Sequence, residues 1–217
     1  MARGAPLAEQ AYAALKRDII RCRLRPGEPI IESWLAAEHG MSKTPVREAI
    51  NLLRREGLVV VVPRRGTFVK SVDIGDVHDT YRLRLLLEPD AAVLASQRAS
   101  AADLDHLDEL SAATTAGGAD LTDINEANRL LHVGIAEAAR VPLMTPMIRS
   151  LHEEVERFFN LQGLLSGSRY TSVNHGRLVD TIRSGDEERV RAVAAEGIQR
   201  SRDYMTEAVL AGNRERA

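Results

Sequence analysis

Cysteine is nearly absent from this chain, and so are aromatic residues and long apolar runs. The single Cys22 excludes a disulfide framework within one chain and fits a reducing, intracellular setting. No stretch approaches the roughly 20 apolar residues of a membrane span, and the first residues have no apolar signal-peptide core. We therefore expect a soluble, cytoplasmic protein. Aromatics make up only 4% of the 217 residues, and plentiful alanine and leucine favour helices.

Charge of both signs is present, but it is unevenly distributed. Residues 1–70 carry 13 lysines and arginines against 7 aspartates and glutamates, a net of +6. Residues 71–217 carry 16 against 24, a net of −8, so the formal charge of −2 conceals a strong asymmetry. This segregation predicts two modules with different partners, the basic one suited to a polyanion. The alternative is a chance distribution of solvated surface charge.

The stretch Ser42–Leu58 predicts a helix that can approach an anionic partner. Pro45 suits its first turn and Gly57 suits its end. Apolar residues recur at helical spacing on one face: Val46, Ala49, Ile50 and Leu53. The start of the helix offers free backbone amides, two hydroxyls and two cations: Ser42, Thr44, Lys43 and Arg47.

The neighbouring segments predict a winged helix-turn-helix. A short helix at about Ser33–His39 precedes Ser42 across a turn that contains Gly40. After the longer helix, two short β-branched segments flank Pro63–Gly66, which predicts a hairpin with arginines at its tip. In this architecture the second helix enters the major groove of DNA, and the wing lies over the backbone or in the minor groove.

These motifs resemble the DNA-binding domain of the GntR family of bacterial transcription regulators. The resemblance covers about residues 8–70 and rests chiefly on Leu24–Glu28, Gly40–Ile50, Glu56–Val59 and Pro63–Val69. It implies that the DNA contacts come from these residues: Ser42, Lys43, Thr44, Pro45, Arg47, Arg65 and Gly66. Lys43 departs from the family's usual arginine, and because lysine lacks a bidentate fork, its base preference would be softer.

Beyond a polar connector, the sequence predicts helices only. They are expected at 76–97, 101–116, 121–139, 143–165, 170–183 and 187–210. Pro89 predicts a kink or break near Glu88. The fold class is therefore mainly α: a winged helix-turn-helix domain with a small β-hairpin at 7–70, a linker at 71–75, and an all-helical bundle of six to seven helices at 76–213.

The helical part resembles the all-helical FCD domain of the FadR-type branch of the same family, over about residues 76–210. The resemblance rests on Arg84–Ala92, Asn128–His132 and His175–Ile182 followed by Gly185. It implies a place for a divalent metal such as Zn, Ni or Mn, with ligands at Asn128, His132 and His175. The fourth ligand position is occupied by Gly197, so the implied site is degenerate. His152, Glu153 or Glu196 could complete it.

Without metal, the same residues would line a polar pocket for an effector: Arg84, Asn128, His132 and His175. Arg84 suits an anionic ligand such as a carboxylate, and the alternative for it is a buried ion pair with Glu88. The function expected is that of a ligand-responsive regulator, in which a homodimer binds a palindromic operator and a small organic acid or similar metabolite modulates binding.

Two other functions remain as alternatives. The first is a constitutive DNA-binding dimer without an effector. The second is an enzyme that uses the His132/His175 pocket. The sequence disfavours an enzyme because it contains no His-Glu-x-x-His pair, no nucleophile motif and no glycine-rich phosphate loop.

Overall fold

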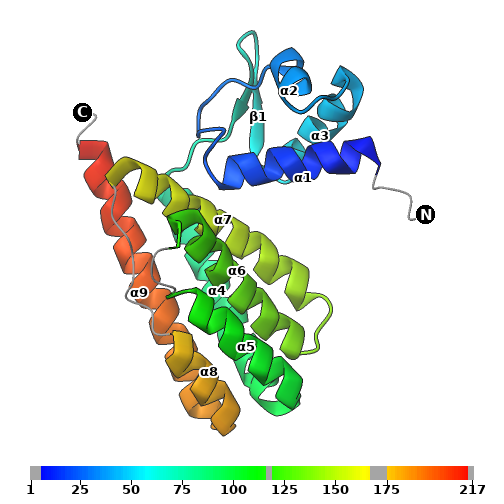
Figure 1. Ribbon diagram of the computed structural model, residues 1–217. Helices are drawn as coiled ribbons and strands as arrows, with labels where there is room; N and C mark the ends of the chain where they lie inside the picture. Colours follow the sequence, from blue (N-terminus) through cyan, green and yellow to red (C-terminus); the bar gives the residue numbers. More distant parts are fainter. Residues whose placement is uncertain (1–5, 116–118, 167–174, 215–217) are drawn as a thin grey trace. The chain divides into compact units, whose positions relative to one another are not determined.

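The computed structural model describes residues 6–115, 119–166 and 175–214. They belong to two compact units, an N-terminal unit, Met1–Val72, and a C-terminal unit, Asp73–Ala217. Helices dominate both, and the described residues form one two-stranded sheet, so the mainly α fold class is confirmed (Figure 1). Within the described ranges, no helix combines the length and the apolar character needed to cross a bilayer.

Three helices build the N-terminal unit, and α1 packs against α3. They are α1 (Leu7–Ile20), α2 (Glu32–Glu38) and α3 (Lys43–Arg55). Their apolar stripes meet in one core, whose best-buried members are no more than 1% exposed: Ala11, Leu15, Ile19, Leu35, Val46, Ala49, Leu53, Val59 and Val69. The stripe predicted for the longer helix is thus its buried face, which directs the opposite side of α3 to solvent.

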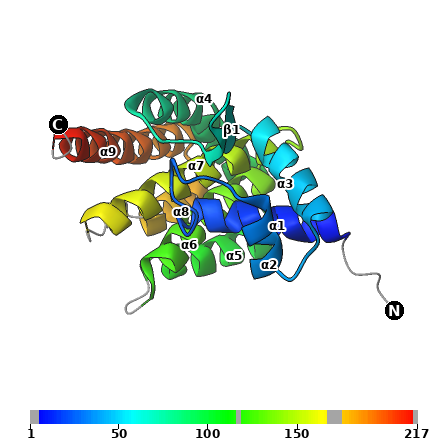
Figure 2. The ribbon, with the colours of Figure 1, turned by 90° about the horizontal axis from the view of Figure 1, so that it is seen from above.

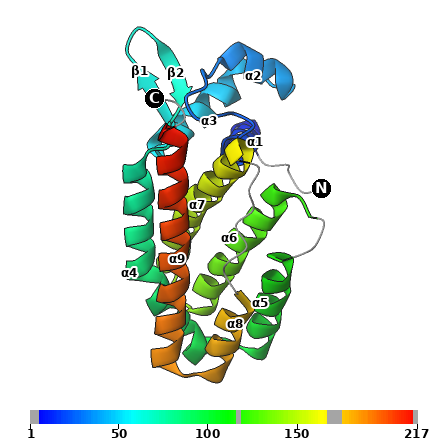
Figure 3. The ribbon, with the colours of Figure 1, turned by 90° about the vertical axis from the view of Figure 1, so that its left-hand side faces the viewer.

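A β-hairpin closes the N-terminal unit (Figure 3). Strands β1 (Val59–Val62) and β2 (Gly66–Val69) pair antiparallel, with Val59 opposite Val69 and Val62 opposite Gly66. Gly66 has a φ of +114°, in the left-handed half of the map where side chains are strained, so glycine suits the turn into β2. The predicted wing is therefore present.

The helix starts differ from the prediction in one detail. α2 begins at Glu32 after Ile31, so Ser33 lies inside the helix and does not cap it. Ser42 does stand at the N-cap position of α3, but its side chain makes no capping hydrogen bond. The first amides of α3 therefore remain open to an external acceptor.

Six described helices form the C-terminal unit: α4 (Ile74–Arg98), α5 (Ala101–Ala113), α6 (Leu121–Ala138), α7 (Met144–Ser166), α8 (His175–Ser184) and α9 (Glu187–Arg214). α4 lies alongside α9 (Figure 2), and it also contacts α6, α7 and α8. α6 lies between α5 and α7 (Figures 1 and 3). Side chains that α4 and α6 point inwards therefore meet in the interior of the bundle.

α4 corrects two expectations. It begins at Ile74, earlier than the predicted start at 76, because Asp73 and Asp76 form a capping box. The helix also continues through the buried Pro89, so of the predicted kink or break near Glu88 the break is absent. A proline inside a helix costs about 3 kcal/mol, and the packing of α4 against four other helices offsets that loss. The predicted helix start at 170 and the predicted end at 116 lie outside the described residues.

Candidate functional site

The first turn of α3 presents a polar, basic surface. Ser42, Lys43, Thr44 and Arg47 are all exposed, as expected of residues that meet DNA. Pro45, which was expected in the same surface, is buried instead. Because its ring packs inwards, Pro45 shapes the first turn of α3.

Arg47 is held by a carboxylate from α2. Its Nε lies 3.2 and 3.1 Å from Glu32 Oε1 and Oε2, and its Nη2 lies 2.8 Å from Oε2. The hydrogen bonds from Arg47, helped by the charges of Arg47 and Lys43, lower the pKa of the Glu32 carboxyl. Glu32 was not foreseen from the sequence as part of this surface.

The tip of the wing carries the second basic group. Arg64, Arg65 and Gly66 are exposed, and the Arg65 guanidinium lies 5.9 Å from the centre of the Phe68 ring. Arg64 has a positive φ of 63°, as expected at a tight hairpin turn. The wing thus holds two cations on a turn whose next residue, Gly66, leaves room for a backbone approach.

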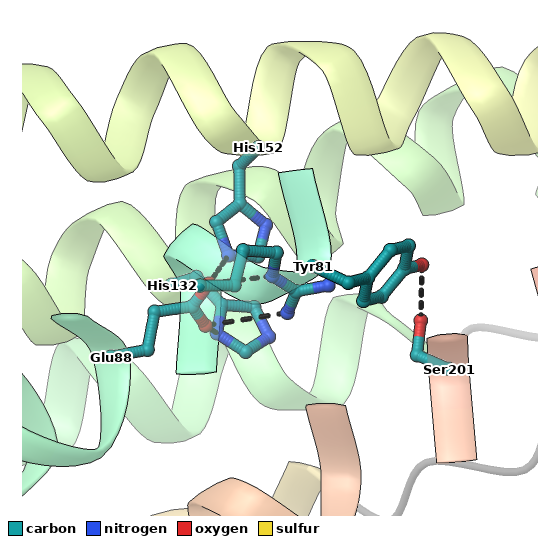
Figure 4. A network of polar contacts seen from close by, with 6 residues as sticks. Tyr81, Glu88, His132, His152 and Ser201 are labelled. Carbon is teal, nitrogen blue, oxygen red and sulfur yellow. Dashed lines mark hydrogen bonds and ion pairs between the residues drawn. The ribbon is translucent and has the colours of Figure 1, made fainter. Parts of the chain in front are cut away.

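A cluster of four ionisable side chains lies inside the C-terminal unit, and we call it the Glu88 cluster: Arg84, Glu88, His132 and His152 (Figure 4). Arg84 Nε lies 2.5 Å from Glu88 Oε1, and Arg84 Nη2 lies 3.3 Å from Oε2. His152 Nε2 is 2.9 Å from Oε1, and His132 Nδ1 is 2.9 Å from Oε2. The two imidazoles stack, with ring centres 4.1 Å apart. Glu88 is the centre of the arrangement.

Burial and charge set the protonation of the cluster. Burial opposes the charge on Glu88, but Arg84, together with the two histidines, holds the pKa of this carboxyl well below its usual value. Burial likewise opposes the charge on Arg84, but the Glu88 carboxylate outweighs it and raises the pKa of Arg84. Burial lowers the pKa of His152 to about 3, against the influence of Glu88. Since Arg84 already balances Glu88, we assign His152 as a neutral hydrogen-bond donor.

Two further polar contacts surround this cluster. His175 packs edge-on against His132, with ring centres 5.6 Å apart, and its Nδ1 lies 3.1 Å from Thr114 Oγ1. Burial, with the charges of His132 and Arg84, lowers the pKa of His175 to about 3. On the other side, Tyr81 has its ring 5.0 Å from the Arg84 guanidinium and its hydroxyl 2.7 Å from Ser201 Oγ (Figure 4). The Glu88 cluster therefore links α4, α6 and α7, and the surrounding contacts extend from it to α8 and α9.

A small cavity adjoins Glu88 and His132. Its empty volume is about 280 Å³, including space that is open to solvent. Apart from those two side chains its walls are apolar: Ala91, Ala92, Ile135, Ile148, Leu178 and Ala194. The cavity therefore has one polar end and apolar walls.

The effector residues expected from the sequence are only partly brought together. Arg84 is buried and paired with Glu88, which is the alternative that the sequence had left open. His132 lines the cavity, and His175 packs edge-on against the ring of His132. Asn128 is half-buried one turn before His132 on α6 and is not a member of the Glu88 cluster. Glu88 entered the sequence reasoning only as a partner of Arg84, and His152 only as a possible extra ligand.

The residues present fit a metal poorly. Among the histidines, cysteines and carboxylates of the described part of the chain, the donors that converge are Glu88, His132 and His152, with ligand atoms within 4.8 Å of one another. This group contains His132 from the expected set and does not contain His175. Arg84 donates to both oxygens of the same carboxylate. A dication would have to displace this guanidinium and then remain beside it, which costs electrostatic energy. No functional step is therefore assigned to a metal.

Comparison with known proteins identifies the family. A family model described as bacterial regulatory proteins, gntR family, matches residues 7–69, and the FCD domain model matches residues 79–200. The chain belongs to the GntR family. Its pairing of the two domains fits the FadR-type subfamily.

Individual relatives agree with this assignment. The uncharacterized regulator YdhC of Bacillus subtilis is 33% identical over 58% of this chain and 58% of its own length. The Nta operon transcriptional regulator of Aminobacter aminovorans is 27% identical over 85% of this chain and 88% of its own length. The Escherichia coli McbR/YncC structure superposes with a TM-score of 0.77 at 25% identity, covering 94% of this chain and 98% of that one.

The extent of these matches varies. The alignments with the first curated relatives span less than two thirds of those proteins, 58% of YdhC and 36% of the Escherichia coli repressor RspR. All of these relatives carry the names of transcription regulators and none that of an enzyme, which agrees with the expectation that this protein is not an enzyme.

Proposed function

We propose that the protein is a ligand-responsive transcription regulator that binds double-stranded DNA through its N-terminal unit. The observation that supports this most strongly is the two-sided character of α3. One side is an apolar stripe buried in the core, and the other begins with exposed hydroxyls and cations. A helix of this kind, followed by a basic wing, is suited to enter the major groove while the wing contacts the backbone.

The proposed active form is a homodimer acting in the cytoplasm. A dimer presents two copies of α3 to two half-sites, so the operator is expected to be palindromic. Neutralisation of phosphates by cations such as Lys43 and Arg65 makes binding strongly dependent on salt. Lys43 offers a point charge in place of a planar fork, so it is expected to contribute more to affinity than to base discrimination.

The C-terminal unit is proposed to sense a small organic acid or a similar metabolite. The cavity beside Glu88 and His132 has one polar end and apolar walls, which suits a short amphipathic molecule. A carboxylate that enters meets His132 beside the Glu88 carboxylate, while Arg84 is not among the residues that line the cavity and is paired with Glu88. Binding would then disturb the Glu88 cluster, and through it the helices that the cluster joins.

DNA binding is tested with duplexes selected from a randomised pool by the protein itself. The expected result is a palindromic consensus that binds far more tightly than a scrambled duplex, with an affinity that falls steeply with salt. Arg47→Ala should weaken binding to the selected duplex by about tenfold or more, as the loss of one good base or phosphate contact predicts. Arg23→Ala, an exposed arginine on another part of the N-terminal unit, serves as the matched control. Equal affinity for selected and scrambled duplexes would refute sequence-specific regulation.

Effector binding is tested by thermal shift with pairs of organic acids and their amides. An acid that raises the melting temperature where its amide does not would support a carboxylate effector, and the same acid should change affinity for the selected duplex. Ala194→Leu, which fills the cavity from α9, should abolish the shift while DNA binding without ligand persists. If no metabolite alters DNA affinity, the constitutive DNA-binding dimer becomes the better description.

A further inference from the structure

One side chain of the proposed DNA surface is already oriented before any DNA is present. Arg47 donates hydrogen bonds from Nε and Nη2 to the carboxylate of Glu32. The two residues come from different helices of the helix-turn-helix, α2 and α3, so the contact spans the turn between them. This ion pair needs a functional explanation because exposed ion pairs contribute little to stability by themselves.

The hydrogen bonds to Glu32 leave the other end of the Arg47 guanidinium available to an external acceptor. A guanidinium carries five N–H donors, one on Nε and two on each terminal nitrogen. Glu32 engages the edge formed by Nε and Nη2, so both donors of Nη1 and one donor of Nη2 remain on the far end. That far end has the spacing of a bidentate donor and matches the paired acceptors O6 and N7 of guanine in the major groove.

Exposure agrees with this orientation. The Arg47 side chain is 63% exposed although it is paired, while Glu32 is 35% exposed. The carboxylate therefore lies nearer to the protein body and the guanidinium nearer to solvent. The charge of Lys43, in the first turn of α3, also lowers the pKa of Glu32, so both cations of this surface favour the ionised carboxylate.

We propose that Glu32 is a positioning residue that holds Arg47 with its free edge directed at a base pair, and so contributes to operator specificity without touching DNA. The inference rests on the proposed DNA binding. An arginine without a partner loses rotamer freedom when it binds DNA. An arginine that is already paired within the protein has lost this freedom beforehand, so binding costs less conformational entropy. An arginine fixed against the protein is also less able to turn aside to a neighbouring phosphate, which would give affinity without sequence selection.

The effect of neutralising Glu32 on DNA affinity distinguishes positioning of Arg47 from simple competition with phosphates. If Glu32 only competed with phosphates for Arg47, its neutralisation would tighten binding to every duplex equally. If Glu32 positions Arg47, neutralisation releases the guanidinium, weakens the selected contact and leaves non-specific binding unchanged or stronger.

The experiment measures the affinity of the full-length protein for the selected duplex and for a scrambled duplex of equal length, by fluorescence anisotropy at two salt concentrations. Glu32→Gln removes the charge and keeps the size of the side chain. The expected result is a fall of about two- to tenfold in the preference for the selected duplex, the range set by one immobilised long side chain. Glu38→Gln, an exposed residue on the same helix, makes the same charge change and should leave the preference intact.

A second comparison shows whether Glu32 acts through Arg47. In an Arg47→Ala background, measured at low salt so that both duplexes still bind, Glu32→Gln should no longer alter the preference. Positioning by Glu32 is overturned if Glu32→Gln raises both affinities equally, if it behaves as Glu38→Gln does, or if its effect persists without Arg47. If the unmodified protein selects no sequence at all, it is the proposed regulator that fails, and that outcome is visible before any variant is made.

Discussion

The buried histidines make the stability of the C-terminal unit depend on pH. His152 and His175 are 0% and 8% exposed, and burial lowers the pKa of each to about 3. In the unfolded chain a histidine has a pKa of about 6.5. Between these values the unfolded chain binds a proton that the folded chain does not, so the free energy of unfolding decreases as the pH falls.

The size of the effect follows from the two pKa values. Between pH 7 and pH 5, each histidine whose pKa is lowered to about 3 removes about 2 kcal/mol from the free energy of unfolding, or about 4 kcal/mol for the pair. This is a large part of the 5–15 kcal/mol typical of a domain. Glu88 acts in a lower window. Its pKa is held below the usual 4.5, so its contribution is present above that pH and is lost as the pH falls through the folded pKa.

Urea unfolding at pH 7 and pH 5 with a chelator present measures this effect. Ellipticity at 222 nm follows the helices of both units, and the fluorescence of Trp34, the one tryptophan, follows the N-terminal unit. His152→Gln keeps a neutral donor for Glu88 and cannot titrate. Between pH 7 and pH 5, the free energy of unfolding of this variant should therefore fall by about 2 kcal/mol less than that of the wild type. His106→Gln replaces a histidine that is 62% exposed and serves as the control. An identical pH dependence in wild type and His152→Gln would refute the assignment of His152 as a neutral buried donor.

Three further predictions concern the interior. Tyr81→Phe removes the 2.7 Å hydrogen bond to Ser201 and should cost about 0.5–1.5 kcal/mol in urea unfolding, with little further loss when Ser201→Ala is added; additive losses would mean that the two side chains act separately. Leu53→Ala empties part of a core position that is 0% exposed, so the Trp34 transition should lose about 2–5 kcal/mol, and an unchanged transition would contradict the core as described. Elemental analysis of the purified protein should find far less than one Zn, Ni or Mn per chain; one tightly held ion in the wild type would contradict the poor fit of the Glu88 cluster to a metal.

The N-terminal unit could be predicted closely because its signals are local. The apolar stripe of α3, its proline and the turn at Gly40 are all read within about twenty consecutive residues. The hairpin is equally local, since β1 and β2 are separated only by 63–65. Pro45 was predicted among the DNA contacts, and its burial could not be foreseen because membership of a motif does not say which way a side chain faces. That direction depends on how α3 rotates its stripe onto α1, which is a tertiary contact.

The Glu88 cluster could not be predicted as a unit. Glu88 and Arg84 share a helix face at i and i+4, and this relation is visible in the sequence. Glu88 and His152 are 64 residues apart, and their contact exists only because α4 and α7 pack together. Helical spacing could pair Asn128 with His132, but it could not show that His132 turns towards Glu88. Pairing of Glu32 with Arg47, 15 residues apart, was missed for the same reason.

The position of Arg84 in the Glu88 cluster explains why the metal expected from the family fits poorly here. A buried carboxylate needs a counter-charge, which a bound dication can supply. In this chain the counter-charge is the guanidinium of Arg84, one turn from Glu88 on the same helix. The Glu88 carboxylate therefore stays ionised without an ion from solution. Gly197, at the position where the family resemblance implies a fourth ligand, has no side chain that could bind a metal, which agrees with a carboxylate balanced by Arg84. A ligand that draws Arg84 or His132 away from Glu88 would leave a buried charge uncompensated, at a cost of several kcal/mol. That cost is comparable to the coupling energies by which effectors shift regulators between states, so this cluster is a suitable place for the proposed effector to act.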